Sequence, residues 1–410
     1  MNLVTINIDT IRVGLPLPYS IRDENGALLA PKGYVVPSQA NLDQVTQNRK
    51  NLFIDVAESE SHRRAFVGKL HSMVRNDLAL GQIADSQFSS FELEPAALVA
   101  DTDEPNWLDL QGQTYALLRD PNPASFCARL DKLHGQLSAL SRVNPDGTLF
   151  ALVHLSSSEL QLYSATHAML VSVMCGLAAR EVLKWPAEQE AILCRAALTM
   201  NIGMTELQDR LAQQKQPVSP DQRRLIDQHA DRSARILDQL GIDEPLHIEA
   251  VLWHHIKIPG ALAQRTPGQR MARLIQRADM FASRLAPRVS RYPESPASAM
   301  QASYFDENRQ VDEAGAALIK AMGIYTPGSF VRLASEEIAV VIKRGANTTT
   351  PRVAILINRA GMPTGEMIVR DTSKPEFRIL AGVPHRDVNV KINLERLLVL
   401  TKTSFSDRPW

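Results

Sequence analysis

The 410-residue sequence predicts a mainly α-helical protein, in which a helix bundle is flanked by a small N-terminal β module and a C-terminal β-rich unit. Three observations predict this class. From about residue 159 to residue 288, apolar residues recur at three- and four-residue steps, which is the spacing of amphipathic helices. Residues 1–56 alternate in the manner of strands, and short apolar runs return after residue 325.

The N-terminal β module is expected at residues 1–56. Its strands are predicted at residues 3–8, 15–21 and 52–56, and the Asn25-Gly26 pair between apolar stretches is a strong hairpin signal. Residues 57–154 are polar and mostly helical in pattern, with an acidic, loop-like stretch at 92–106. We predict that they form a partly ordered helical connector.

The helical domain is predicted at residues 155–324. One helix is expected from Ser219, a good N-cap followed by a proline at the first helical position, to Gly241, a typical C-terminal signal. Its inward face would include Leu225 and His229. After a helix at 312–322, strands at 329–333, 338–342 and 353–357 predict a β-rich unit over residues 325–403.

Composition excludes several classes of function. Lys+Arg and Asp+Glu number 45 each, so the chain has no excess positive charge to hold a nucleic-acid backbone. The three cysteines share no CxxC spacing and are expected to be reduced. No signal peptide is evident, and the apolar run at 168–179 is too short to cross a bilayer. We predict a cytoplasmic protein without a membrane span.

Five polar residues fall on predicted apolar helix faces: His167, His229, His254, His255 and Asp279. A buried imidazole or carboxylate without a partner costs several kcal/mol, on the order of 2–7. These side chains are therefore expected to need one another, a metal ion or a ligand, and histidine is the commonest metal-binding residue. The pattern predicts a metal site.

The order and spacing of these residues resemble an HD-GYP domain, the branch of the HD phosphohydrolases that cleaves cyclic di-GMP. The resemblance covers residues 155–345, and it implies an HD-type helix bundle. His167 is similar to the first metal-binding histidine of the family, His229 to the next, Trp253-His254-His255 to the paired histidines and Arg277-Ala278-Asp279 to the closing aspartate. The exit into a β hairpin at 324–333 is similar as well.

Departures from the family pattern decide the predicted function. The family's His-Asp doublet, which supplies a terminal ligand and a carboxylate that bridges two metals, is replaced by Met200 and Asn201. The lysine that follows is replaced by Met204, and residues 256–262 lack the GYP motif. A neutral amide cannot bridge two cations. A dinuclear centre is therefore disfavoured.

Two interpretations of the remaining site stay open. In one, His229, His254 and His255 hold one divalent transition metal, with Asn201 or water as a fourth ligand, while His167 and Asp279 pair with each other. In the other, all of these residues form a polar core without metal. The lone histidines are predicted to be surface or packing residues: His62, His71, His134, His154, His247 and His385. Arg223-Arg224 and Lys343-Arg344 are predicted to be solvated.

The sequence thus favours a catalytically degenerate HD-GYP protein that binds signalling proteins of the cyclic di-GMP network or a nucleotide ligand. The alternative is a metal-dependent phosphohydrolase that uses the residual three-histidine site. A third interpretation places the binding function in the C-terminal β unit, with the bundle as a spacer.

Overall fold

The computed structural model divides the chain into two compact units, residues 1–105 and 106–410, each of which is described here by itself. The described residues are 3–6, 17, 20–23, 28–30, 34, 36, 52–55, 106–158, 162–258, 261–289, 294–365, 367–388, 390 and 392–402. The predicted Asn25-Gly26 turn, residues 57–105 of the predicted connector, His62 and His71 lie outside them.

The first unit contains a four-stranded sheet of short strands, in the order β1-β4-β2-β3. The strands are β1 (Leu3–Ile6), β2 (Ile21–Arg22), β3 (Leu28–Ala30) and β4 (Leu52–Asp55). β1 pairs with β4 and β2 with β3, all antiparallel. The β2–β3 pairing is the one that the predicted hairpin requires, and the small N-terminal β module is confirmed.

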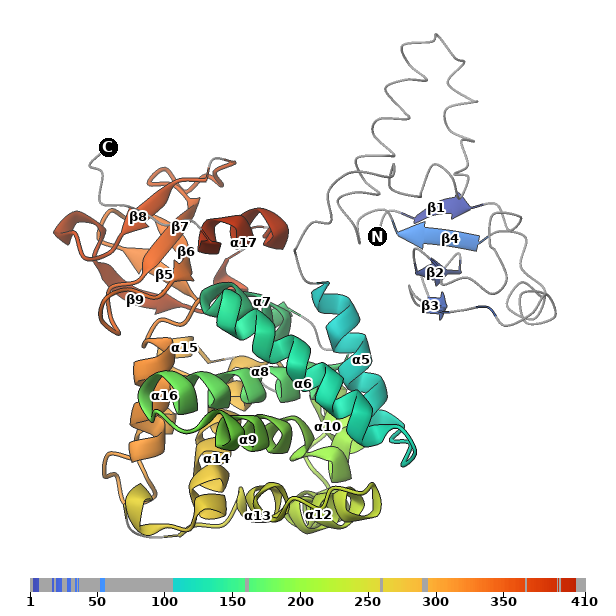
Figure 1. Ribbon diagram of the computed structural model, residues 1–410. Coiled ribbons are helices and arrows are strands. Elements are labelled where there is room, and N and C mark those ends of the chain that lie inside the picture. Colours follow the sequence, from blue (N-terminus) through green and yellow to red (C-terminus); the bar gives the residue numbers. More distant parts are fainter. Residues whose placement is uncertain are drawn as a thin grey trace. The chain divides into compact units, whose positions relative to one another are not determined.

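The second unit is mostly helical (Figure 1). Its bundle contains α5 (Trp107–Arg119), α6 (Phe126–Val143), α7 (Pro145–Ser158), α8 (Tyr163–Leu177), α9 (Ala187–Thr199), α10 (Thr205–Gln213), α11 (Pro220–Asp227), α12 (His229–Gln239), α13 (Pro245–Trp253), α14 (Pro267–Leu285), α15 (Pro296–Tyr304) and α16 (Glu313–Met322). The predicted mainly α fold class is confirmed.

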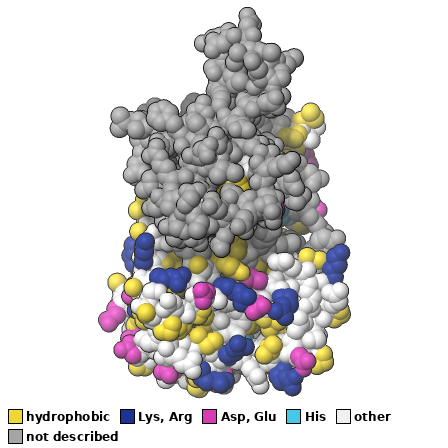
Figure 2. Space-filling view, turned by 90° about the vertical axis from the view of Figure 1, so that its right-hand side faces the viewer, with side chains coloured by type: hydrophobic (Ala, Val, Ile, Leu, Met, Phe, Trp, Pro, Cys, Tyr) yellow, Lys and Arg dark blue, Asp and Glu magenta, His cyan; other side chains and the backbone are white. Residues whose placement is uncertain are grey.

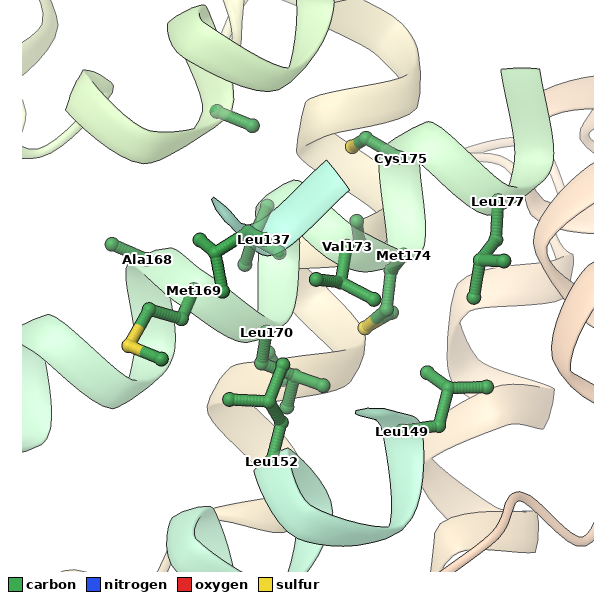
Figure 3. Packing of buried hydrophobic residues seen from close by; sticks show 14 of the residues in the cluster. Leu137, Leu149, Leu152, Ala168, Met169, Leu170, Val173, Met174, Cys175 and Leu177 are labelled. Carbon is green, nitrogen blue, oxygen red and sulfur yellow. The ribbon is translucent and has the colours of Figure 1, made fainter. Parts of the chain in front are cut away.

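Helix α8 is the centre of the bundle, and every one of its residues is buried. Figure 3 shows Met169, Leu170 and Met174 of this helix beside Leu149 and Leu152 of α7. The helix continues through a π-helical turn, Ala178–Val182, so the apolar stretch Tyr163–Leu183 is longer than the predicted run at 168–179. It is long and apolar enough to cross a membrane, but 78% of its most apolar window is buried inside the protein. This burial is that of a core helix.

The predicted helix from Ser219 to Gly241 is wrong in one respect, because the structure breaks it at Gln228 into α11 and α12. The capping box of Ser219 and Gln222 opens α11 as expected. However, α11 buries none of its residues, and Leu225 is 44% exposed. The continuous inward face that helical periodicity implies therefore begins only at His229.

The C-terminal strands form a five-stranded antiparallel sheet in the order β8-β7-β6-β5-β9. The strands are β5 (Phe330–Leu333), β6 (Ile338–Lys343), β7 (Arg352–Ile357), β8 (Val369–Asp371) and β9 (Ile379–Val383), followed by α17 (Leu394–Lys402). The three strands predicted here are confirmed. Alternate residues of β5 and β6 face two cores: Phe330 and Val340 join the bundle's core, whereas Val331 and Ala339 join a separate small cluster.

Arg344 anchors this sheet to the bundle, so its predicted role as a solvated residue is wrong. Its Nε donates to Asp146 of α7 at 2.7 Å, and its Nη1 donates to Glu181 at 2.7 Å. Elsewhere the charges are mixed: on the described atoms of the face shown in Figure 2, cationic and anionic side chains are interspersed. This fits the equal numbers of acidic and basic residues in the chain.

Candidate metal centre

The predicted site residues come from the ends and faces of four helices that pack against one another. His229 is the first residue of α12, and His254 is the C-cap of α13, followed by His255. His167 lies in the middle of α8 and Asp279 in the middle of α14. α12 packs on α13, α13 on α14, and α14 on α8 (Figure 1). The fold thus brings residues up to 112 positions apart into contact.

Three histidines cluster closely, and their ligand atoms lie within 4.8 Å of one another: His229, His254 and His255. His229 and His254 are buried, whereas His255 is exposed. The ring centroid of His255 is 4.1 Å from that of His254 and 4.8 Å from that of His229. The cluster therefore has one closed side and one side open to solvent.

Backbone carbonyls determine which nitrogen of each buried ring is available. His229 Nδ1 bonds the carbonyl of Ile226, and His254 Nδ1 bonds the carbonyl of Val251. Because a carbonyl oxygen only accepts, each Nδ1 carries the proton and each Nε2 keeps a free lone pair. The two Nε2 atoms face each other at 3.1 Å.

Two facing lone pairs repel unless a proton or a metal ion lies between them. Burial lowers the pKa of both rings, that of His254 well below its ordinary value, and the neighbouring histidines lower it further. A shared proton is therefore disfavoured near neutral pH. Two nitrogens that are each about 2.1 Å from one metal ion can stand about 3 Å apart. The three imidazoles therefore fit a divalent transition metal.

His167 and Asp279 form the pair that the sequence suggested. His167 Nε2 lies 2.7 Å from Asp279 Oδ1, with His167 buried and the Asp279 side chain 18% exposed. Burial opposes the charge on Asp279, but the hydrogen bond and the charge of His167 outweigh it, and the fields of His255 and His254 add to them. The pKa of Asp279 is held well below its usual range. The pair thus lies within electrostatic reach of the histidine cluster.

The segment predicted to replace the family's His-Asp doublet lies between α9 and α10. Met200 is 1% exposed and belongs to the hydrophobic core, whereas Met204 is half-buried. Asn201 is buried, and its Oδ1 has no hydrogen-bond partner among the described residues. Gly203 N donates to Ser233 Oγ of α12 at 2.9 Å, which holds this segment against the helix that carries His229.

The remaining candidates lie away from the cluster. His247 is a packing residue as predicted, buried on α13 with its Nε2 2.8 Å from Thr199 Oγ1. His154 and His385 are not alone, because their rings lie 6.4 Å apart. A cavity of about 450 Å³ lies beyond Lys257 and is lined by Arg265, Arg273 and Asp312 among others. It includes none of the predicted site residues. Sequence patterns gave no signal for the buried Arg273–Asp312 ion pair that lines it.

Comparisons with known proteins bear on this site. No protein-family model matches the chain. A cyclic di-GMP phosphodiesterase from Pseudomonas aeruginosa is 24% identical to it over 348 residues, which cover 82% of this chain and 81% of that protein. The resemblance to the HD-GYP family is confirmed. Among solved structures, an HDG"Y"P protein from Bdellovibrio bacteriovorus is 16% identical, with a TM-score of 0.42, over 77% of this chain and 98% of that one.

The HD-GYP resemblance predicts which side chains the site should contain, so the residues found there can be compared with that prediction. Of the histidines predicted as ligands, the structure brings His229, His254 and His255 together. Met200 and Asn201, which the sequence predicts at the position of the family's doublet, are a buried core methionine and a buried neutral amide.

Proposed function

We propose that this chain is a catalytically degenerate HD-GYP protein that acts in cyclic di-GMP signalling by binding a nucleotide or a partner protein. The observation that carries the proposal concerns the residues that would have to hold a second metal ion beside the three-histidine cluster. Met200 is packed in the core, and His167 Nε2 is hydrogen-bonded to Asp279. In two-metal sites the ions lie about 3.5–4 Å apart, and in the family a carboxylate of the doublet bridges them. Asn201, a neutral amide, cannot supply this bridge.

The loss extends beyond the metal ligands. Met204 stands where the family has a lysine, and a thioether cannot donate a proton to a leaving group. The GYP motif is absent from the segment after His255, of which residues 259–260 lie outside the described part. Binding does not need these groups. The name of the Pseudomonas aeruginosa relative supports cyclic di-GMP as the nucleotide to test first.

The test is to incubate the purified chain with cyclic di-GMP and, in turn, Mn²⁺, Fe²⁺ and Zn²⁺, and to measure hydrolysis and binding separately. We expect no turnover. Met200→His with Asn201→Asp is also expected not to hydrolyse cyclic di-GMP, because Met204 and the altered loop remain. Turnover by the unmodified chain that disappears in His255→Gln would refute the proposal. Turnover by the double variant would contradict only the expectation that Met204 and the altered loop keep the site inactive.

A second candidate is a metal-dependent phosphohydrolase, which the facing Nε2 atoms of His229 and His254 favour. A bound divalent ion would supply a Lewis acid for a phosphate group. The carbonyls of Ile226 and Val251 would orient the two buried rings, and the exposed side of His255 would leave room for a substrate. Metal-dependent turnover of a phosphate ester other than cyclic di-GMP would favour this candidate.

A further inference from the structure

The donor atoms that the three-histidine cluster offers are imidazole nitrogens, which bind a metal ion in their neutral form. Its described members are His229, His254 and His255, and the nearby carboxylate of Asp279 is hydrogen-bonded to His167. Imidazole donors suit zinc, copper, nickel and iron, whereas manganese, magnesium and calcium prefer carboxylate and carbonyl oxygens. A set of imidazoles without a carboxylate therefore selects against the hard ions.

Two of the three ligands are already oriented. Each buried ring is held at a helix end by a hydrogen bond from its own Nδ1 to a carbonyl three residues earlier, Ile226 for His229 and Val251 for His254. For His229 this carbonyl comes from the last turn of α11, just before the break at Gln228. Such outer partners fix the tautomer and raise the basicity of the free nitrogen. Little side-chain ordering would accompany binding.

The surroundings of the cluster favour a single ion. The neighbouring position is filled by the His167–Asp279 pair, and Met200 is directed into the core. Asn201 Oδ1 is buried without a hydrogen-bond partner in the described part of the chain, and Gly203 ties its segment to α12. An amide oxygen or water can complete a coordination sphere without a bridging role. Three histidines with an open fourth position are a known zinc arrangement.

We propose that this cluster binds a single zinc ion, with His255 as the exposed ligand, and that it selects zinc over manganese. The inference rests on the proposed loss of the dinuclear centre, and it specifies the ion that replaces it. It concerns binding, so it holds whether or not the bound chain hydrolyses any ester.

The experiment uses the full chain stripped with a chelator and then equilibrated with Zn²⁺ or Mn²⁺. Elemental analysis gives stoichiometry, competition with a chromophoric chelator gives affinity, and Co²⁺ in place of Zn²⁺ gives a visible spectrum that reports the ligand field. The test variant is His255→Gln, because an exposed side chain is replaced without disturbing the core. The matched control is His134→Gln on α6, a half-buried histidine outside the cluster. Asp279→Asn tests the carboxylate.

We expect about one equivalent of zinc, bound far more tightly than manganese. His255→Gln should weaken binding by more than about 100-fold, since loss of a mere outer partner already costs 10–100-fold. His134→Gln should not change it, and Asp279→Asn should stay within about tenfold. Two equivalents of metal, equal affinity for manganese, or zinc affinity unchanged in His255→Gln would overturn the inference.

The same samples separate this inference from the proposed function. A chain that binds one zinc ion and hydrolyses cyclic di-GMP would overturn the proposed function and leave the inference intact. A chain that binds no metal and hydrolyses nothing would overturn the inference alone.

Discussion

A single buried imidazole, His247, makes the stability of the bundle depend on pH. It is 1% exposed, and its hydrogen bond to Thr199 joins α13 to the end of α9. Burial lowers its pKa to about 3, and the charge of Arg195 lowers it further. An unfolded histidine titrates near pH 6.5. Between about pH 6.5 and pH 3 the unfolded chain therefore binds a proton that the folded chain does not, so stability falls as the pH falls through this window.

Replacing this group should make the protein less sensitive to acid. From pH 7 to pH 5, His247 alone is expected to remove about 2 kcal/mol from the free energy of unfolding. In His247→Gln this pH-dependent loss should disappear, and the free energy of unfolding at pH 7 should fall by about 1 kcal/mol. Urea denaturation at both pH values measures the difference. Thr199→Val is the control, because it removes the hydrogen bond but keeps the titrating ring. Equal acid sensitivity of His247→Gln and the unmodified chain would contradict this account.

At the same scale, the sequence identified the polar residues that meet but not how they pair. Helical periodicity placed His167, His229 and Asp279 on apolar faces, and all three lie in the cluster or beside it. Whether His167 bonds Asp279 or a metal depends on contacts between α8 and α14, which a local pattern does not contain. Which nitrogen of His229 and of His254 is free to bind a metal depends on the hydrogen bonds from their Nδ1 atoms to the carbonyls of Ile226 and Val251. A residue pattern does not show these bonds.

At the scale of elements, local helix signals predict one helix where the structure has two, α11 and α12. Residues 219–241 carry signals for one helix, with a capping box at one end and a glycine at the other. In the structure, α11 projects an unburied turn and α12 starts at His229. The position of the break follows from tertiary contacts at the start of α12. Strands and caps that depend on local residues, such as β5, β6 and the Asp312 cap of α16, were predictable.

Gly203 tests how closely the replaced doublet approaches α12. A Cβ at this position would lie 2.8 Å from Ser233 N and 3.0 Å from His229 O. Both are backbone atoms, so the segment or the helix would have to move. Gly203→Ala is expected to destabilise the protein by about 1–3 kcal/mol, as overpacking does, and to weaken metal binding at His229.

The matched control is Gly135→Ala on α6, where nothing lies within 4 Å of the added Cβ. It should stabilise the protein by about 0.5–1 kcal/mol, since glycine is unfavourable inside a helix. Thermal denaturation of both variants, with zinc affinity alongside, measures the contrast. A Gly203→Ala protein as stable as Gly135→Ala would show that the segment is not packed against α12.

At the scale of the whole molecule, the predicted boundaries at 56/57, 154/155 and 324/325 stay predictions, but the main hydrophobic core of residues 106–410 is continuous. Buried residues from α5 to α17 form one cluster, and Phe330, Ile342 and Leu356 of the C-terminal sheet belong to it. Sequence patterns locate helices and strands well, yet they do not show which elements share a core. A hydrophobic face looks the same whether it covers its own domain or the next.

This shared core predicts how the chain responds to truncation. A chain that ends at Gly323 would expose the bundle residues that the sheet covers and would leave Asp146 and Glu181 without Arg344. We expect it to aggregate or to lose its cooperative unfolding transition, because removing one side of a core exposes apolar area worth about 25 cal/mol per Å². A chain that starts at Asn106 keeps the whole cluster and should melt cooperatively. Size-exclusion chromatography and thermal circular dichroism of the two chains measure the contrast. If the chain that ends at Gly323 were monomeric and unfolded cooperatively, the bundle would be an independent domain. That result would support the interpretation of the C-terminal unit as a separate binding module.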